Sequence, residues 1–316
     1  MLARPVSAWT VLGLSALLVL LCSAGASASR PDASCGELAF SSNRHGNIDI
    51  YVIRSDGTHL RRLTHSRARD RTPAWSPDGT GIAFRSDRDG NNEIYTMNAD
   101  GSHLTDITNN PATDYSPAWS PDGKSIAFAS DRADDGRLIN DIWLMAVDGS
   151  QPRQLEQRVG IDEYPVWSPD GKTIAFACTN GMVHDQRIGD FEVCAMDADG
   201  RHQWQLTDAA GTSQAYSWSP DGQRIAFESS RRLGHASVMG GDIYTMNADG
   251  SRVTHLARGA QPAWSCDGRR FALTRSDRRG VNLYLMTTAG KRQRALTRNT
   301  SENADPAWRP CPGCGP

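Results

Sequence analysis

Three aspartates recur at one position of a repeated phrase: Asp70, Asp114 and Asp162 each stand three residues before the phrase's proline position. Carboxylates gathered at one place can bind a peptide amine, a Lys or Arg side chain, or a hard cation such as calcium. The alternative is that an Asp at the start of a strand caps a turn through its own backbone. The residues that we predict to bind a ligand at or next to this position of the repeat are Asp70, Asp114, Asp162, the adjacent Glu163, Ser213 and Asn303.

Two histidines, His184 and His235, lie in segments where the repeated units differ in length. Together with Asp185 or Asp190 they could bind a metal ion or act as a base. The chain otherwise has no Gly-x-Ser-x-Gly elbow, no His-Glu-x-x-His motif and no phosphate-binding glycine loop. We therefore expect a protein that is not an enzyme and holds no cofactor, and we retain both histidines as candidate binding residues.

The phrase ends each time in a tryptophan, and the spacings are 44, 48, 51, 46 and 44 residues from Trp75 to Trp308. A self-similar unit of roughly 20 to 50 residues indicates a solenoid or a propeller. Because the tryptophans recur in register with apolar strands, we expect the indoles to pack between repeats and not to stack on a ligand.

One copy of the repeat, from Pro73 to Thr108, contains four short strands separated by Pro-Asp-Gly, Gly-Asn and Asp-Gly turns. Four antiparallel strands make one propeller blade. Five copies are complete, whereas residues 38–64 supply only the last three strands of a sixth and residues 306–308 supply its first strand. We predict an all-β, six-bladed propeller over residues 37–310, closed by the C-terminal strand joining the N-terminal blade.

The recurrence of Trp-Ser-Pro-Asp-Gly, Ile-Ala-Phe, Ser-Asp-Arg and Met-Asn-Ala-Asp-Gly in one fixed order resembles the TolB-type propeller repeat, a WD40-like family. The resemblance implies the fold but leaves the chemistry open, since one fold hosts many functions. Some propellers with related repeats are pectin-fragment lyases. A carbohydrate-active, lyase-like enzyme with a metal and histidine site assembled from separate blades is therefore the alternative function.

Six cysteines follow the first 28 residues, and an even number suits an oxidising compartment. Cys178 and Cys194 fall on consecutive strands of one blade and could form a disulfide. For the others we prefer Cys35–Cys311 and Cys266–Cys314, with Cys311 and Cys314 exchanged as a nearly equal alternative. We read Cys311-Pro312-Gly313-Cys314 as structural, because no thioredoxin-like pattern or second zinc-ribbon pair accompanies it.

The N-terminal residues resemble an export signal: Arg4 is followed by a largely apolar stretch from Trp9 to Leu21 and then by small residues. We predict a signal peptide over residues 1–28, a short segment over 29–36, the propeller, and a Cys-rich tail over 311–316. The mature protein should be secreted or periplasmic, without a stable membrane span. A net charge of −2 with no basic stripe argues against nucleic-acid binding.

The loops on the two faces of the predicted disc differ. Turns after the first and third strands are short, whereas the other face carries enlarged loops at residues 133–140, 179–190 and 231–241. The first strands line the central channel, so we expect the acidic positions to ring its mouth near these loops. We therefore predict a monomeric scaffold that binds a protein, peptide or glycan there, with a calcium-like cation as a further option.

Overall fold

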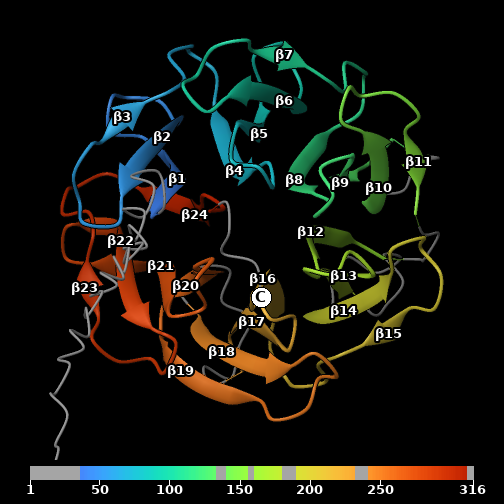
Figure 1. The fold of residues 1–316 in the computed structure, drawn as a ribbon, viewed down its shortest axis with the longest axis vertical. Helices are drawn as coiled ribbons and strands as arrows, with labels where there is room; N and C mark the ends of the chain where they lie inside the picture. Colours follow the sequence, from blue (N-terminus) through green and yellow to red (C-terminus); the bar gives the residue numbers. More distant parts are fainter. Residues whose placement is uncertain (1–35, 133–139, 156–159, 180–189, 232–240, 312–316) are drawn as a thin grey trace, which may run out of the picture. The chain divides into compact units, whose positions relative to one another are not determined.

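The computed structural model describes residues 36–132, 140–155, 160–179, 190–231 and 241–311. Six four-stranded antiparallel sheets follow one another around a ring, with the first strand of each sheet innermost (Figure 1). This confirms the predicted six-bladed propeller. Within the described ranges there is no helix long and apolar enough to cross a membrane. The predicted signal peptide, Cys35 and Cys314 lie outside the described residues.

Each blade consists of four strands, named in order from the channel outward. Blade 1 comprises β24 (Asn303–Trp308), β1 (Glu37–Ser42), β2 (Asp49–Arg54) and β3 (Arg61–Arg62). Blade 2 comprises β4 (Asp70–Trp75), β5 (Gly81–Ser86), β6 (Glu93–Asn98) and β7 (Thr105–Asp106). Blade 3 comprises β8 (Asp114–Trp119), β9 (Ser125–Ser130), β10 (Asp141–Ala146) and β11 (Arg153–Gln154).

The second half of the ring repeats this order. Blade 4 comprises β12 (Asp162–Trp167), β13 (Thr173–Thr179), β14 (Phe191–Asp197) and β15 (Trp204–Gln205). Blade 5 comprises β16 (Ser213–Trp218), β17 (Arg224–Ser229), β18 (Asp242–Asn247) and β19 (Thr254–Arg258). Blade 6 comprises β20 (Ala260–Trp264), β21 (Arg270–Asp277), β22 (Gly280–Thr287) and β23 (Arg294–Ala295).

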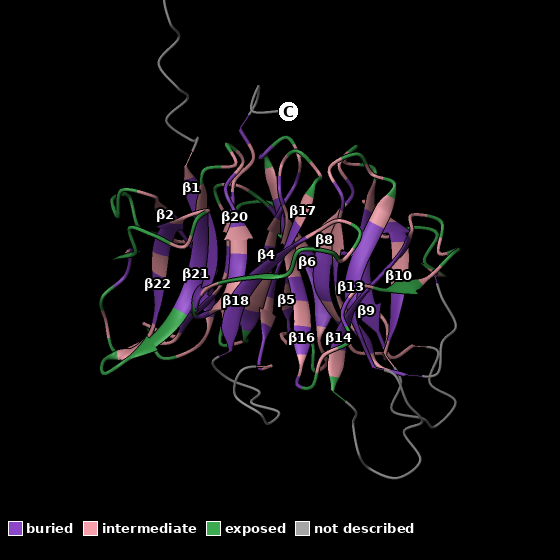
Figure 2. Ribbon diagram, turned by 90° about the horizontal axis from the view of Figure 1, so that it is seen from below, coloured by how far each residue is buried: buried purple, intermediate pink, exposed green. Residues whose placement is uncertain are grey.

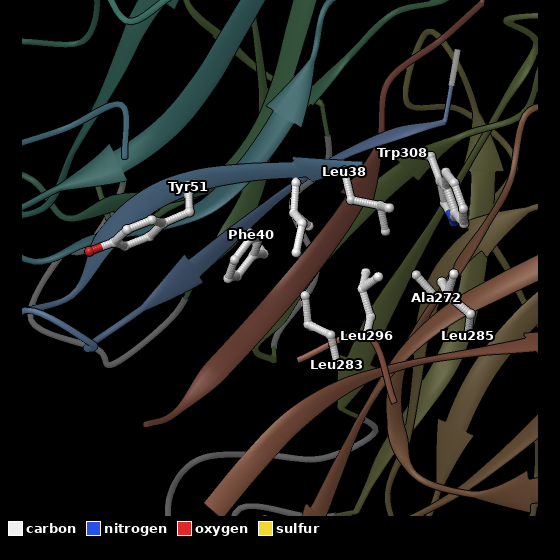
Figure 3. Close-up of a cluster of buried hydrophobic side chains, with 9 residues drawn as sticks. Leu38, Phe40, Tyr51, Ala272, Leu283, Leu285, Leu296 and Trp308 are labelled. Carbon is white, nitrogen blue, oxygen red and sulfur yellow. The ribbon is translucent and has the colours of Figure 1, made fainter. Parts of the chain in front are cut away.

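The ring closes where β24, from the C-terminal end of the chain, pairs with β1. Leu38 lies opposite Trp308 in the register, as the split sixth copy of the repeat predicts. A buried cluster then joins this blade to blade 6 across the seam: Leu38, Phe40 and Trp308 contribute from blade 1, and Ala272 and Leu285 from blade 6 (Figure 3). Closure is therefore secured both by strand pairing and by an apolar core shared between two blades.

The tryptophans of the repeat pack between blades, as expected. The indole Nε1 of Trp308 donates a hydrogen bond to Ala263 O of the preceding blade at 3.0 Å, and Trp167 and Trp218 make the equivalent bonds at 3.2 Å. Trp75, Trp264 and Trp308 are at most 8% exposed. Most strand residues around them are also buried, and exposure concentrates in turns and outer strands (Figure 2).

Replacing Trp308 should therefore destabilise the ring much more than replacing a tryptophan outside the repeat. We expect Trp308→Ala to lower the free energy of unfolding by about 3–5 kcal/mol, because it leaves a cavity at the seam. The control is Trp204→Ala on β15, where the side chain is 38% exposed; it should cost less than about 1 kcal/mol. Urea denaturation of both variants measures the difference, and equal losses would contradict the seam's role.

The Asp-Gly turn between the third and fourth strands packs against the preceding blade. Gly149 has φ = 82°, and a Cβ atom built on it would lie 2.1 Å from Ile107 O. No side chain fits at that distance, and the positive φ itself favours glycine. The short turns of this face are thus fixed by blade-to-blade contact.

Each inner strand except that of blade 5 carries a residue in the left-handed region directly before its proline. Thr72, Ser116, Tyr164, Gln261 and Asp305 have φ between 50° and 55°. The register to the second strand shifts at the same place, as in β4 between Arg71 and Ala74, which defines a β-bulge. The bulge interrupts the in–out alternation of the strand and sets which side chains face the channel.

The predicted disulfide between Cys178 and Cys194 is present. It links β13 to β14 within blade 4, with a Cα–Cα distance of 5.8 Å. The other described pair, Cys266 and Cys311, has its sulfur atoms 3.0 Å apart. This contact favours the alternative pairing of Cys266 with Cys311, whereas the preferred pairs require Cys35 and Cys314, which lie outside the described residues.

Removing the blade 4 disulfide should lower stability without changing the fold. Cys178→Ala with Cys194→Ala is expected to reduce the free energy of unfolding by about 2–4 kcal/mol, because the unfolded chain regains the freedom of the closed loop. Chemical denaturation under oxidising conditions isolates this pair, since Cys266 and Cys311 then stay in one redox state in both proteins. An unchanged unfolding midpoint would contradict the prediction.

Candidate functional site

The aspartates predicted to ring the channel mouth are buried inside the blades. Asp70 and Asp114 are both 0% exposed. Arg88 Nη2 donates to Asp70 Oδ1 at 3.0 Å, and Arg132 Nη2 donates to Asp114 Oδ2 at 2.5 Å. The expectation that these carboxylates face a ligand at the mouth is therefore corrected: each one neutralises an arginine of its own blade.

The remaining residues of that position are also buried. Asp162 is 1% exposed, and Ser213 and Asn303 are 0% exposed. Ser213 Oγ lies 2.9 Å from Ser229 Oγ, and Asn303 Oδ1 accepts hydrogen bonds from Ser42 and Arg44. In blades 1, 2, 3 and 5 this recurring position therefore makes contacts within its own blade. Of the predicted binding residues that the structure describes, Glu163 alone is only partly buried.

The arginines of the Ser-Asp-Arg motif explain why the aspartates turn inward. The Arg88 guanidinium lies 4.5 Å from the ring centre of Tyr95, and that of Arg132 lies 4.9 Å from the ring centre of Phe128. Each arginine is held by an aromatic face as well as by an aspartate. This confirms the structural interpretation for both motifs, whereas Arg278 of the third copy is exposed in the β21–β22 hairpin.

The residue directly after the recurring position stands on the innermost strand of each blade and varies in type among the blades. These residues are, in blade order, Ala304, Arg71, Tyr115, Glu163, Gln214 and Ala260, and we call them the variable ring. Tyr115 Oη donates to Glu163 Oε1 at 2.6 Å, which joins blades 3 and 4, and Asn140 Nδ2 donates to the same oxygen at 3.0 Å. Burial and the neighbouring Glu163 raise the pKa of Tyr115, so this phenol stays protonated.

Two second-strand residues beside the variable ring carry opposite charges. Arg85 pairs in register with Arg71 in blade 2, and Glu228 pairs with Gln214 in blade 5. Blades 2 and 5 face each other across the ring (Figure 1). Burial lowers the pKa of Arg85 and raises that of Glu228. Glu228 is held by backbone N–H groups of Gly241 and Gln261, both at 3.2 Å.

The channel contains an open cavity of about 430 Å³. Its wall consists of the Pro-Ala-Trp segments or their equivalents from all six blades, together with turn prolines such as Pro121 and Pro169. Polar groups enter it from the bulges: Thr72, Ser116, Tyr164, Gln261 and Asp305. The rings of Tyr164 and Tyr216 lie 6.1 Å apart in this wall, and burial followed by Glu163 raises the pKa of Tyr164 to about 12. The volume suits a short peptide segment or a small molecule.

A buried acid outside the channel, Asp141 of β10, has its pKa raised to about 7 by burial and by the nearby carboxylate of Asp162, although a hydrogen bond from Gln154 opposes the shift. An unfolded Asp ionises near pH 3.9. The folded protein therefore keeps a proton that the unfolded chain loses, and the contribution of Asp141 to stability falls as the pH rises from about 4 to about 7.

Asp141→Asn should consequently stabilise the protein more at pH about 8 than at pH about 5, because the amide cannot ionise. Thermal unfolding of variant and wild type at both pH values measures the change. Asp148→Asn is the control: Asp148 is exposed in a turn, and hydrogen bonds from Ser150 lower its pKa, so its effect should be the same at both values. A pH-independent effect of Asp141→Asn would contradict the shift.

The described histidines lie away from the channel wall. His59, His103 and His202 occupy the outer Asp-Gly turns with positive φ, and His255 of β19 lies 3.3 Å from Asp242. The candidates His184 and His235 are outside the described residues. Among the residues that are described, no three His, Cys, Asp or Glu side chains form a group that could hold a metal ion.

Three family models match parts of the chain: the Tricorn protease N-terminal β-propeller domain over residues 29–138, the dipeptidyl peptidase IV N-terminal region over 120–232, and the TolB β-propeller domain over 182–312. A TolB homologue of Chlorobium luteolum is 49% identical over 47 residues, or 15% of this chain. The match covers only 11% of that relative's length.

Solved structures show the same fold over most of the chain. TolB from Acinetobacter baumannii superposes with a TM-score of 0.73 at 23% identity, covering 87% of this chain and 67% of that one. An oligogalacturonate lyase in complex with manganese superposes with a TM-score of 0.55 at 15% identity, covering 83% and 74%. At these identities the likeness concerns the fold alone.

The fold and the channel together define a six-bladed β-propeller whose central channel has a largely apolar wall with polar groups at the bulges. Its repeats are similar to those of the TolB β-propeller domain over residues 182–312.

Sequence reasoning missed the residues that form this channel. Arg71, Tyr115 and Gln214 follow the recurring position directly, and Arg85 and Glu228 stand in second strands where Ala129 and Ala177 are the equivalents. The signal in the sequence was variation: this position changes charge and size from copy to copy, whereas the flanking Pro-Ala-Trp hardly changes. Residues that a repeat does not need for packing are candidates for binding.

Proposed function

We propose that this protein is a non-enzymatic, extracytoplasmic binding protein whose ligand is a protein or peptide segment that enters the central channel. The observation that carries the proposal is the variable ring. A cation, a phenol, a carboxylate and an amide occupy one repeat position on the innermost strands, although two of them also join neighbouring blades through the Tyr115–Glu163 hydrogen bond.

The chemistry of this wall suits a polypeptide. Arg71 and the amide nitrogen of Gln214 supply hydrogen-bond donors, Glu163 supplies an acceptor, and the aromatic rings of Tyr164 and Tyr216 offer an apolar contact. The Gln214 oxygen already accepts a hydrogen bond from Tyr216. A peptide presents donors and acceptors in alternation together with side chains, so a mixed wall can satisfy it. The proline-lined cavity next to this ring provides the space for an inserted segment.

An extracytoplasmic location is supported by two independent features of the chain. The predicted signal peptide over residues 1–28 directs export, and the Cys178–Cys194 disulfide suits an oxidising compartment. The balanced charge fits a ligand other than nucleic acid. A monomeric state remains our expectation.

The lyase alternative has less support from the described residues. It requires histidines and metal ligands brought together at the channel, and the described histidines lie on the outer strands and turns. We therefore place binding ahead of catalysis.

Site-specific photo-crosslinking in the source cells tests the proposal. Azidophenylalanine in place of Tyr115 should give a protein adduct on illumination, and the adduct yield should fall at least about fivefold when Arg71→Gln and Glu163→Gln are added. The matched control is the same substitution at Tyr284, whose hydroxyl also donates to a carboxylate, that of Asp277 at 3.0 Å, but on the outer side of blade 6.

Adducts identified by mass spectrometry should arise from the Tyr115 position and not from the Tyr284 position. Equal adducts from both positions, or none from Tyr115, would overturn the proposal. Circular dichroism of each variant shows that the propeller is intact.

A further inference from the structure

The channel contains a cation that its own fold does not neutralise. Arg85 of β5 makes no hydrogen bond or ion pair with any described residue, and its Nε atom is buried. Arg85 lies opposite Arg71 of the innermost strand in the register, and the charged and phenolic groups that influence its pKa, Asp305, Arg71, Tyr164 and Tyr115, are all on inner strands. Burial lowers the pKa of Arg85, which expresses the cost of holding this charge away from water.

Asp305 is the acid with the largest effect on Arg85, yet its oxygens are used elsewhere. Gln261 Nε2 donates to Asp305 Oδ1 at 2.7 Å, and Ser41 Oγ donates to Oδ2 at 2.6 Å. The backbone N–H of Thr72 also points at Oδ2, at 3.3 Å. Asp305 is thus fixed as a link between blades 6, 1 and 2, and no described acid lies within ion-pair distance of Arg85.

Two hydroxyl groups near this cation are also without partners among the described residues. Thr72 Oγ1 and Ser116 Oγ are buried and make no hydrogen bond, and Ser116 as a whole is 6% exposed. Both residues lie at the bulges of neighbouring inner strands and line the cavity. A buried hydroxyl that donates to nothing costs about 1–3 kcal/mol, so an acceptor bound at this part of the wall would be stabilised by these two groups.

We propose that Arg85, assisted by Arg71 and the hydroxyls of Thr72 and Ser116, binds a carboxylate group of the ligand inside the channel. A guanidinium binds a carboxylate through two parallel hydrogen bonds, and the hydroxyls can donate to its remaining lone pairs. The inference rests on the proposed binding function and specifies the chemistry of the partner.

The surrounding charges select the kind of anion. Glu163, Glu228 and Asp305 face the same channel, and their field opposes a doubly charged group such as phosphate more than a singly charged carboxylate. The Tyr164 and Tyr216 rings provide an apolar surface for the part of the ligand next to the charge. A chain terminus and an Asp or Glu side chain both satisfy this description.

Titration of the full chain with three small peptides tests the inference. The probes are acetyl-Gly-Phe-Gly with a free terminal carboxylate, the same peptide as its amide, and acetyl-Gly-Glu-Gly amide. Binding is followed by calorimetry and by the NMR signal of the arginine Nε–H groups. At least one carboxylate probe should bind about tenfold or more tightly than the neutral amide, and which one binds identifies a terminus or a side chain as the source.

Arg85→Gln should abolish this discrimination and leave the protein folded, because removing an unpaired buried charge does not destabilise the ring. Arg275→Gln is the matched control, since Arg275 is an exposed arginine of β21 that contacts Gln293; it should keep the wild-type discrimination. Equal binding of acid and amide, or discrimination that survives in Arg85→Gln, would overturn the inference. So would a large loss of thermal stability in Arg85→Gln, which would assign the residue a structural role.

The crosslinking yield at position 115 separates this inference from the proposed function. Partner adducts that persist undiminished in Arg85→Gln would leave the channel as a binding site but remove the carboxylate from its recognition. Carboxylate binding without any partner adduct would retain the anion site and refute the protein or peptide partner.

Discussion

No blade of this protein can bury both of its faces alone, and burial between neighbouring blades is the constraint on which the other features depend. Ile, Phe and Met side chains from one sheet pack against the next in six clusters, each shared by adjacent blades. An open row of blades would leave one face of each end sheet uncovered, whereas a closed ring covers every face. The pairing of β24 with β1 is therefore a condition for the whole core and not a local detail of the termini.

The same constraint explains why the fold could be predicted from the sequence. Each copy must present the same tryptophan to its neighbour, so Trp308 at the C-terminal end, together with the three strands of residues 38–64, was enough to predict a split blade and a closed ring of six. The tight contact of Gly149 with the preceding blade fixes the Asp-Gly turns in the same way. Features that serve packing between repeats recur, and recurrence is visible in a sequence.

The candidate site could not be predicted with the same success, because the repeat does not state which way a side chain points. Successive residues of a strand point to opposite sides, and Asp70 and Arg71 pair in regular register before the bulge at Thr72, so the two side chains cannot point the same way. The first residue of the strand, Asp70, turns into the blade toward Arg88, and the second, Arg71, points to the other side. Reading the recurring aspartates as the exposed set was wrong for this physical reason, whereas Glu163, one residue further on, is only partly buried.

The channel charges differ in kind from the buried charges of the blades. Asp70 and Asp114 are each neutralised by an arginine of the same blade, so their burial is compensated locally. Arg85 has no such partner, although the equivalent positions of blades 3 and 4 hold Ala129 and Ala177, which shows that a small apolar residue satisfies the packing there. Glu228, opposite Arg85, is held by backbone N–H groups and not by a cation. Alanine is sufficient for packing at this position of the repeat. An unpaired guanidinium at the same position in blade 2 therefore lowers the stability of the fold without a gain in packing. A ligand that supplies the missing anion offsets this cost, because the guanidinium is already partly buried and has no ion-pair partner among the described residues of the folded protein.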